Sequence, residues 1–253
     1  MGLTYSSTSK KSLKDLFNVE KSSEDDLVVA LAGNPNTGKS TVFNSLTGLH
    51  QHTGNWPGKT VTNTQGKYSF IDKNFIVVDL PGTYSLLASS IEEIVARDFI
   101  CFGRPDVTVV VLDSTCIERN FNLLLQIMEI TPRVVVCLNL MDEAKKKNIK
   151  IDVTSLEERL GVPIVPSVAR SNKGMDNLKE KIYDVSLGNI LPIPRKIAYR
   201  SEITNMICEL SPKLKKIFGN NINTDWLALR LLDGDKSILD SISKYLNTDI
   251  NIY

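Results

Sequence analysis

Short apolar runs alternate along the chain with segments in which apolar residues recur every three or four positions. Four runs are long enough for buried strands and too short for buried helices: LVVALA from Leu27, FIVVDL from Phe75, VTVVVL from Val107 and VVVCL from Val134. Helical spacing occupies residues 40–49, 91–102, 116–130, 153–160 and 174–185. Val-rich strands that alternate with helices are typical of a parallel sheet covered on both faces, so the pattern predicts an α/β fold with a mainly parallel sheet.

The same pattern predicts one antiparallel strand at the edge of this sheet. Residues 68–71 and 75–80 favour two strands around the turn Asp72-Lys73-Asn74, which is a hairpin signal. Residues 51–59 (QHTGNWPGK) contain two glycines and a proline and have no periodicity. This segment is therefore expected to be a loop.

Differences in composition divide the chain into three parts. The polar residues 1–26 predict a flexible N-terminal segment. Residues 27–187 carry the alternating strands and helices. The stretch from Leu187 to Ile197 holds two prolines and a glycine, and only helical spacing recurs beyond it. Residues 188–253 are therefore expected to form a small all-helical domain.

The charge balance argues against a protein that coats nucleic acid. Lys and Arg number 30 and Asp and Glu number 29, which leaves a net charge of +1, whereas nucleic-acid binding needs a basic excess or stripe. The longest apolar runs are far shorter than the roughly 20 residues that a membrane-spanning helix needs. The composition predicts an ordinary globular domain with no nucleic-acid partner.

Residues 33–40 (GNPNTGKS) match the pattern G-x-x-x-x-G-K-[ST] between a predicted strand and a predicted helix. The glycines let the backbone curl so that consecutive N–H groups face a phosphate chain. Lys39 can neutralise the β- and γ-phosphates, Ser40 can ligate Mg²⁺, and the helix that follows adds its positive end. The predicted nucleotide-binding residues of this loop are Gly33, Asn34, Asn36, Thr37, Gly38, Lys39, Ser40 and Thr41.

Asp79-Leu80-Pro81-Gly82 ends the apolar strand FIVVDL. A carboxylate at this place can hold Mg²⁺ through a water molecule, and the Gly82 N–H could meet a γ-phosphate. An ordinary turn would have the same sequence. The position directly after a buried strand favours the magnesium interpretation for Asp79.

Asn139-Leu140-Met141-Asp142 ends the strand VVVCL. A carboxylate here can accept hydrogen bonds from guanine N1–H and N2–H₂, a donor pair that adenine lacks, so Asp142 is predicted to select guanine. Asn139 is expected to brace neighbouring loops, and Met141 to lie at the nucleotide. The small residues Ser167, Val168 and Ala169 follow the last strand, where their backbone N–H groups could reach the base O6; a plain loop is an equally open reading.

In this order the four motifs resemble the G1, G3, G4 and G5 boxes of Ras-like P-loop GTPases, over about residues 27–187. The resemblance implies a G2 threonine in the loop after the first helix. Thr60 is the candidate, beside Gly58, and Thr62 is the alternate. The resemblance also implies that Thr60 closes on Mg²⁺ and the γ-phosphate, and that Lys39, Thr60 and Gly82 carry the catalysis.

Longer blocks narrow the match. GNPNTGKSTVFNSLTG, HTGNWPGKTVT and DLPGTYSL resemble the cytosolic G domain of the FeoB ferrous iron transporter family, and WLALRLLDGD from Trp226 is similar to a segment of that family's helical domain. The resemblance implies a module that binds GTP or GDP with Mg²⁺, hydrolyses GTP and lies at the cytoplasmic face of the cell membrane. It also implies a membrane domain that this chain lacks, and it leaves a homo-oligomer open.

Two positions bear on how fast such a module hydrolyses GTP. Thr83 stands where Ras-like proteins carry a water-orienting glutamine, and its shorter side chain predicts slow hydrolysis or reliance on other groups. Asn36 resembles the asparagine with which this family helps bind potassium, and carbonyls near Gly54 and Trp56 would supply other ligands. Such a cation could neutralise developing charge. For the Trp56 side chain, docking on the G domain or a partner and plain local packing both stay open.

Two other functions stay open at this point. A GTPase that acts in ribosome or tRNA assembly would need a basic region, and the charge balance gives no sign of one. A GTP-binding scaffold without turnover would carry the same motifs.

Overall fold

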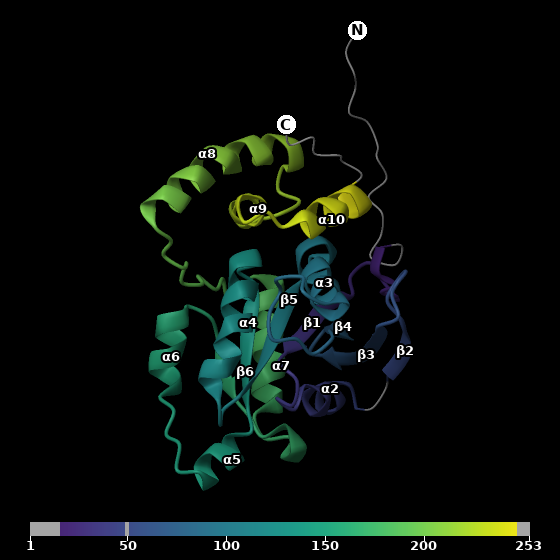
Figure 1. Ribbon diagram of the computed structural model, residues 1–253. Helices are drawn as coiled ribbons and strands as arrows, with labels where there is room; N and C mark the ends of the chain where they lie inside the picture. The colour runs from purple at the N-terminus through teal and green to yellow at the C-terminus, as the bar shows by residue number, and fades with distance from the viewer. Residues whose placement is uncertain (1–15, 49–50, 247–253) are drawn as a thin grey trace.

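The computed structural model describes residues 16–48 and 51–246 of the chain. In these residues a twisted sheet lies between two layers of helices, and α8, α9 and α10 lie together at one end of the molecule (Figure 1). The helices α2 and α7 cover one face of the sheet, while α3, η1, α4 and α6 cover the other. The predicted α/β fold with an appended helical part is confirmed.

The strand order of the sheet is β2-β3-β4-β1-β5-β6-β7. The pairs from β4 through β7 are parallel, whereas β3 runs antiparallel to both β2 and β4. The strands are β1 (Leu27–Gly33), β2 (Gln51–Asn55), β3 (Thr62–Phe70), β4 (Lys73–Asp79), β5 (Val107–Asp113), β6 (Val134–Asn139) and β7 (Ile164–Pro166).

The edge of the sheet differs from its prediction. The predicted loop over residues 51–59 contains a strand, β2, and β3 is longer than expected because it begins at Thr62. The antiparallel edge therefore holds two strands beside β4. The side chains of β2 are exposed or half-buried, so no alternation of apolar and polar residues marks it in the sequence.

The predicted helices fall close to their predicted places, except over residues 91–102, and the short helices α5 and η2 were not predicted. The predicted helix over residues 91–102 is the α-helix α3 followed by a π-helical turn, η1. The helices of the sheet part are α2 (Lys39–Thr47), α3 (Ile91–Asp98), η1 (Phe99–Gly103), α4 (Ile117–Ile130), α5 (Met141–Lys146), α6 (Val153–Leu160), η2 (Ala169–Ser171) and α7 (Met175–Leu187).

The part of the N-terminal segment that the structure describes is packed, not flexible. Phe17 and Val19 are buried, and the Phe17 ring lies 5.3 Å from the Phe99 ring and 4.9 Å from the Tyr245 ring between centroids. Trp56 completes this aromatic cluster, 5.3 Å from Phe99, so its docking on the molecule's own core is confirmed. Within the predicted flexible segment, Phe17 and Val19 are therefore packed on the core while residues 20–25 are exposed, and residues 1–15 lie outside the described part.

Residues 189–200 connect the sheet part to three helices and contain no helix or strand. The helices are α8 (Ser201–Phe218), α9 (Thr224–Leu232) and α10 (Lys236–Leu246). Trp226, Leu227 and Ala228 of α9 are buried in the core that α3, η1 and α4 also line. The helical part is therefore joined to the sheet part by apolar packing.

A buried ion-pair network ties α10 to α3. Arg97 is 0% exposed, and its Nη2 donates to Asp98 Oδ1 at 2.8 Å and to Ser241 Oγ at 2.9 Å. Its Nη1 donates to Asp235 Oδ2 at 3.2 Å and to Ser237 Oγ at 2.7 Å. Burial raises the pKa of Asp98, and the Arg97 guanidinium opposes that rise. Side chains from both parts of the chain thus satisfy one buried cation.

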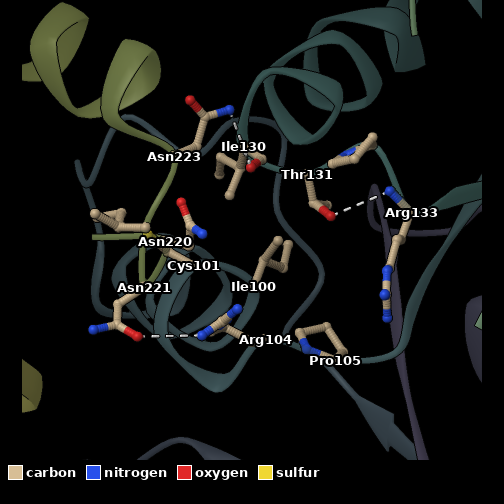
Figure 2. Close-up of a pocket in the computed structure, with 12 residues that line it drawn as sticks. Ile100, Cys101, Arg104, Pro105, Ile130, Thr131, Arg133, Asn220, Asn221 and Asn223 are labelled. Atoms are coloured by element: carbon tan, nitrogen blue, oxygen red, sulfur yellow. Dashed lines mark hydrogen bonds between the residues drawn. The ribbon is translucent and has the colours of Figure 1, made fainter. Parts of the chain in front are cut away.

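A cavity of about 370 Å³ lies between the sheet part and the helical part (Figure 2). Its walls come from η1 and the turn after it, the turn between α4 and β6, and the loop before α9. Arg104 Nη1 donates to Asn221 Oδ1 at 3.4 Å across it. Asn223 caps α9 through its Oδ1, while its Nδ2 donates to the Glu129 carbonyl at 2.8 Å. Asn223 therefore links the start of α9 to the end of α4.

Candidate functional site

Each predicted motif begins where a parallel strand ends. Gly33 ends β1, Asp79 ends β4, Asn139 ends β6 and Pro166 ends β7. The carboxyl ends of parallel strands meet at one edge of the sheet, which is where open α/β sheets bind their ligands. The topology therefore brings together four motifs that are far apart in the sequence.

The loop between β1 and α2 is compact and held by its own polar groups. Gly38 and Asn36 have φ angles of 81° and 68°, and Thr37 Oγ1 donates to the Asn34 carbonyl at 2.9 Å. A Cβ atom on Gly33 would lie 2.8 Å from the Val111 carbonyl oxygen, so only glycine fits beside β5. The Asn34 Nδ2 donates to the Arg119 carbonyl of α4 at 3.3 Å, and its Oδ1 is buried with no hydrogen-bond partner among the described residues.

Lys39 and Asp79 form an ion pair at the centre of this edge. Burial raises the pKa of Asp79, and the neighbouring ammonium group of Lys39 opposes the rise. A Cβ atom on Gly82 would lie 3.5 Å from Pro35 N, which places the backbone after Asp79 directly over the loop. A cation and an anion are thus held together beside the loop, where each could exchange the other for a phosphate or a metal ion.

Asn139 joins the loop after β1 to the loop after β7. Its side chain is buried, and its Nδ2 donates to the Thr37 carbonyl at 3.1 Å. Its Oδ1 accepts the Ala169 N–H at 3.1 Å and lies 3.5 Å from Ser167 Oγ. The Ala169 N–H that was expected to reach a base oxygen is therefore engaged with Asn139.

Asp142 lies at the start of α5, and one of its oxygens is paired. Arg170 Nη2, from the turn η2, donates to Asp142 Oδ2 and also to Glu143 Oε1 at 3.2 Å. The other oxygen, Oδ1, is buried and has no hydrogen-bond partner among the described residues. Met141 is half-buried beside it and Val168 is half-buried in the neighbouring loop. Arg170 was not predicted as a site residue, although it is a cation directly after Ala169 in the sequence.

The segment between β2 and β3 places several predicted residues apart from this centre. Gly58 and Thr60 are exposed in the turn that joins the two strands, and Thr62 begins β3. Gly54, expected in a loop, pairs with Asn63 within the sheet. Trp56, just before this exposed turn, is instead buried in the aromatic cluster. The structure gathers Lys39, Asp79 and Gly82, and it leaves Thr60 open to solvent.

The segment after Gly82 lies along one face of α4. Arg119 Nη2 donates to the Tyr84 hydroxyl at 3.0 Å, and Asn122 Nδ2 donates to the Tyr84 carbonyl at 3.2 Å. The Leu86 N–H donates to Gln126 Oε1 at 2.6 Å. Thr83 is 5% exposed. The three polar side chains of α4 are spaced so that they share one helix face, and that face holds the segment in place.

Two other kinds of site are absent from the described residues. In residues 16–48 and 51–246, no helix has the length and apolar character needed to cross a membrane. The same residues contain no group of three or more His, Cys, Asp or Glu side chains that could hold a metal ion.

Two family models match the chain. One, described as ferrous iron transport protein B, matches residues 27–182, and the other, described as the FeoB cytosolic helical domain, matches residues 199–251. The Fe(2+) transporter FeoB of Escherichia coli strain K12 is 37% identical over 216 residues, which are 83% of this chain and 27% of that relative. A Fe(2+) transport protein A/Fe(2+) transporter FeoB fusion protein of Porphyromonas gingivalis is 37% identical over 214 residues, 83% of this chain and 25% of the fusion protein. The chain spans about a quarter of the length of these curated relatives.

Solved structures agree with the family models. The cytosolic domain of T. maritima FeoB in a GDP form superimposes with a TM-score of 0.78 at 35% identity, covering 90% of this chain and 88% of that chain. The cytosolic domain of L. pneumophila FeoB gives a TM-score of 0.78 at 32% identity, covering 87% of this chain and 86% of that one. The similarity includes both the sheet and the helical part.

Proposed function

The chain belongs to the family of ferrous iron transport protein B, FeoB, and on that premise we propose that it binds and hydrolyses GTP as the cytosolic module of a ferrous iron transporter. The observation that carries the proposal is the braced cradle: the loop from Gly33 to Ser40, tied by Asn139 to the loop that faces Asp142. The loop from Gly33 to Ser40 suits a triphosphate, and the end at Asp142 suits a purine that offers two adjacent N–H donors.

In the proposed nucleotide site, different residues bind the phosphates and the base. Lys39 and the backbone N–H groups of the first loop bind the β- and γ-phosphates, and Asp142 accepts the guanine N1–H and N2–H₂ groups. The full proposed set is Gly33, Asn34, Asn36, Thr37, Gly38, Lys39, Ser40, Thr41, Gly58, Thr60, Asp79, Gly82, Asn139, Met141, Asp142, Ser167, Val168 and Ala169. The Ala169 N–H and the Asn34 Nδ2 already have protein partners, whereas Asn34 Oδ1 is buried without a hydrogen-bond partner among the described residues.

The donor set suits Mg²⁺. Asp79 is a half-buried carboxylate whose present partner is a single ammonium group, and a hard cation prefers such oxygen ligands. Ser40 and Asp79, with Thr60 after closure, would hold the ion. When bound, Mg²⁺ neutralises charge on the phosphates. Lys39 then leaves Asp79 for the β- and γ-phosphates, and the Gly82 N–H, already over the loop, orients the γ-phosphate.

Hydrolysis in this site is proposed to be slow and to depend on potassium. Thr83 is buried and short, so it cannot orient water as a longer amide would. Asn36 and carbonyls near Gly54 and Trp56 are the proposed potassium ligands. In about 100 mM KCl we expect the rate of GTP turnover to be at least about ten-fold higher than in the same concentration of NaCl, because a fixed cation stabilises developing charge. Phosphate release assays measure this.

The control for that comparison is Asn36→Gly, which keeps the positive φ angle of residue 36 and removes its amide. The variant should bind GDP like the parent and turn over GTP at one rate in both salts. Equal rates in the parent would contradict the potassium proposal. No turnover in saturating KCl and MgCl₂ would instead identify a GTP-binding scaffold.

Asp142→Asn tests the guanine assignment. Loss of two charge-assisted hydrogen bonds should weaken GDP binding by about 100-fold, while xanthosine diphosphate, which offers an acceptor at the altered edge, gains affinity. Titration calorimetry with GDP, XDP and ADP in MgCl₂ measures all three. The matched control is Glu143→Gln, which removes the neighbouring charge without touching the proposed base contact. Competition by ATP as strong as that by GTP would overturn the assignment.

The wider role follows from the relatives and is proposed for this chain. Residues 27–187 form the proposed G domain and residues 188–253 the helical regulatory domain. The partner would be a membrane domain of the same transporter, so the module would lie at the cytoplasmic face of the cell membrane, as a monomer or a homo-oligomer. GTP binding and hydrolysis there would drive or regulate Fe²⁺ uptake. A ribosomal or tRNA assembly role loses support because the family match covers both domains.

A further inference from the structure

Arg170 occupies the carboxylate that is assigned to the guanine base. Its Nη2 donates to Asp142 Oδ2 and to Glu143 Oε1, and its side chain is 58% exposed. Asp142 Oδ1 is buried without a partner in the described part of the chain. Recognition of guanine by two hydrogen bonds needs both oxygens of Asp142, so the base and Arg170 cannot both have their full set of contacts.

The two competitors present the same chemistry to Asp142. A guanidinium group offers N–H donors from nitrogens that share one planar carbon, and the N1–C2–N2 edge of guanine offers N–H donors in the same arrangement. Arg170 therefore resembles the edge of the base that Asp142 reads. Adenine has no such edge and would not need Asp142 to be free.

The turn that carries Arg170 is held in shape by its own hydrogen bonds. Within it, the Val168 N–H donates to the Lys173 carbonyl at 2.9 Å, and the Asn172 N–H donates to the Ala169 carbonyl at 3.1 Å. The Ala169 N–H donates a hydrogen bond to Asn139 Oδ1, and Ser45 Oγ of α2 donates one to Asn172 Oδ1. The backbone of residue 170 is thus positioned beside Asp142 before any ligand arrives, and only the side chain must move.

We propose that Arg170 is an internal competitor for the guanine site: its guanidinium group pairs with Asp142 and must be displaced by the base. The proposal rests on the assignment of Asp142 to guanine. Apparent affinity falls by the fraction of molecules in which the site is competent, so pairing weakens every guanine ligand by one common factor. That factor acts on the base and is independent of the number of phosphates.

The test compares Arg170→Gln with the parent protein by titration calorimetry, using GMP, GDP and GTP with MgCl₂. A partly exposed ion pair predicts that the variant binds all three about two- to five-fold more tightly, by the same factor for each. ADP affinity should not change. Lys173→Gln is the matched control, since it removes a cation from the same turn while the Lys173 backbone contact stays, and it should not tighten binding.

Salt gives a second readout that a merely structural role would not produce. Screening weakens an exposed ion pair. The ratio of the parent's dissociation constant to that of the variant should therefore fall towards one as NaCl is raised from about 50 mM to about 500 mM. A background of Asp142→Asn, titrated with XDP, should abolish the effect of Arg170→Gln. Arg170→Lys keeps the charge without the fork and should fall between the parent and Arg170→Gln.

The outcomes separate the two proposals. If Arg170→Gln weakens guanine binding, or tightens GTP more than GMP, Arg170 contacts the bound nucleotide or its phosphates and the competitor role is wrong. If the parent binds GDP, Asp142→Asn lowers that affinity, and Arg170→Gln changes nothing, the competitor role alone fails. If Asp142→Asn leaves GDP binding intact, the guanine assignment itself fails.

Discussion

Replacing Arg97 with methionine is expected to lower the free energy of unfolding by about 3–5 kcal/mol, because removing one member of a buried ion pair leaves an uncompensated charge. Asp98, which is 4% exposed, would keep the Ser241 hydroxyl of α10 as a hydrogen-bond donor. Methionine retains much of the packing volume, so the loss measures the charge. Urea unfolding followed by the fluorescence of Trp56 and of Trp226, one in each part, measures it for both parts.

The sign of the pH dependence identifies Asp98 as the cause. Burial already raises the pKa of Asp98 and Arg97 opposes that rise, so the pKa increases further in the variant. A carboxyl whose folded pKa lies above its unfolded value destabilises the fold at high pH, and protonation removes the cost as pH falls. The deficit of Arg97→Met should therefore shrink from pH 8 to pH 5. Asp98→Asn in the same background should recover part of the stability.

Arg230→Met is the control for that experiment. Arg230 lies in the helical part and pairs with an acid three residues away; its own side chain is 12% exposed, but its partner Asp233 is 62% exposed. An ion pair with such a solvated partner contributes at most about 1 kcal/mol. A loss of similar size in both variants would mean that the network around Arg97 is no stronger than a surface pair.

Gly38→Ala is expected to destabilise the fold by about 2–4 kcal/mol and to eliminate measurable GDP binding. Residue 38 has a φ of 81°, which costs an L-residue about 1–2 kcal/mol, and a new Cβ would lie 2.4 Å from Asn139 Nδ2. The buried amide would have to move, and its hydrogen bonds to Thr37 and Ala169 would be lost. Thermal unfolding and titration with GDP measure the two effects.

Gly234→Ala provides the matched comparison. Residue 234 has a φ of 76°, but nothing lies within 4 Å of the place of its Cβ, so only the backbone cost applies. This variant should lose about 1–2 kcal/mol and bind GDP like the parent. Equal losses of stability and unchanged GDP binding in both variants would show that Asn139 does not hold the loop.

The elements that could be predicted from the sequence are those whose signal is local. The strand from Leu27 and the loop and helix after it are specified by an apolar run, a glycine pattern and helical spacing within twenty-odd residues, and the fold is as predicted there. The parallel order of the sheet follows from alternation of strands and helices. The order of the motifs was sufficient to bring Lys39, Asp79 and Asn139 to one edge, because parallel strands align their ends.

What could not be predicted depends on contacts between distant residues. The strand at residues 51–55 is polar on both faces, so hydrogen bonding to β3 forms it without a hydrophobic pattern. Phe17 is a single aromatic residue in a polar segment, and its burial depends on rings that come later in the chain. A charged residue such as Arg97 on a helix is expected at the surface, and only the placement of α10 buries it.

The aromatic cluster has a practical consequence for how the protein can be divided. Phe17 precedes the first strand, Tyr245 lies in the last helix, and both rings pack with Phe99 or with each other. A shortened version that starts at Leu27 would uncover Trp56 and Phe99, and one that stops before α10 would uncover Phe17 and Phe102. Exposed rings invite aggregation. Enzymology on the motif-bearing region alone would therefore study a molecule without these ring contacts, which join Phe17 to Tyr245.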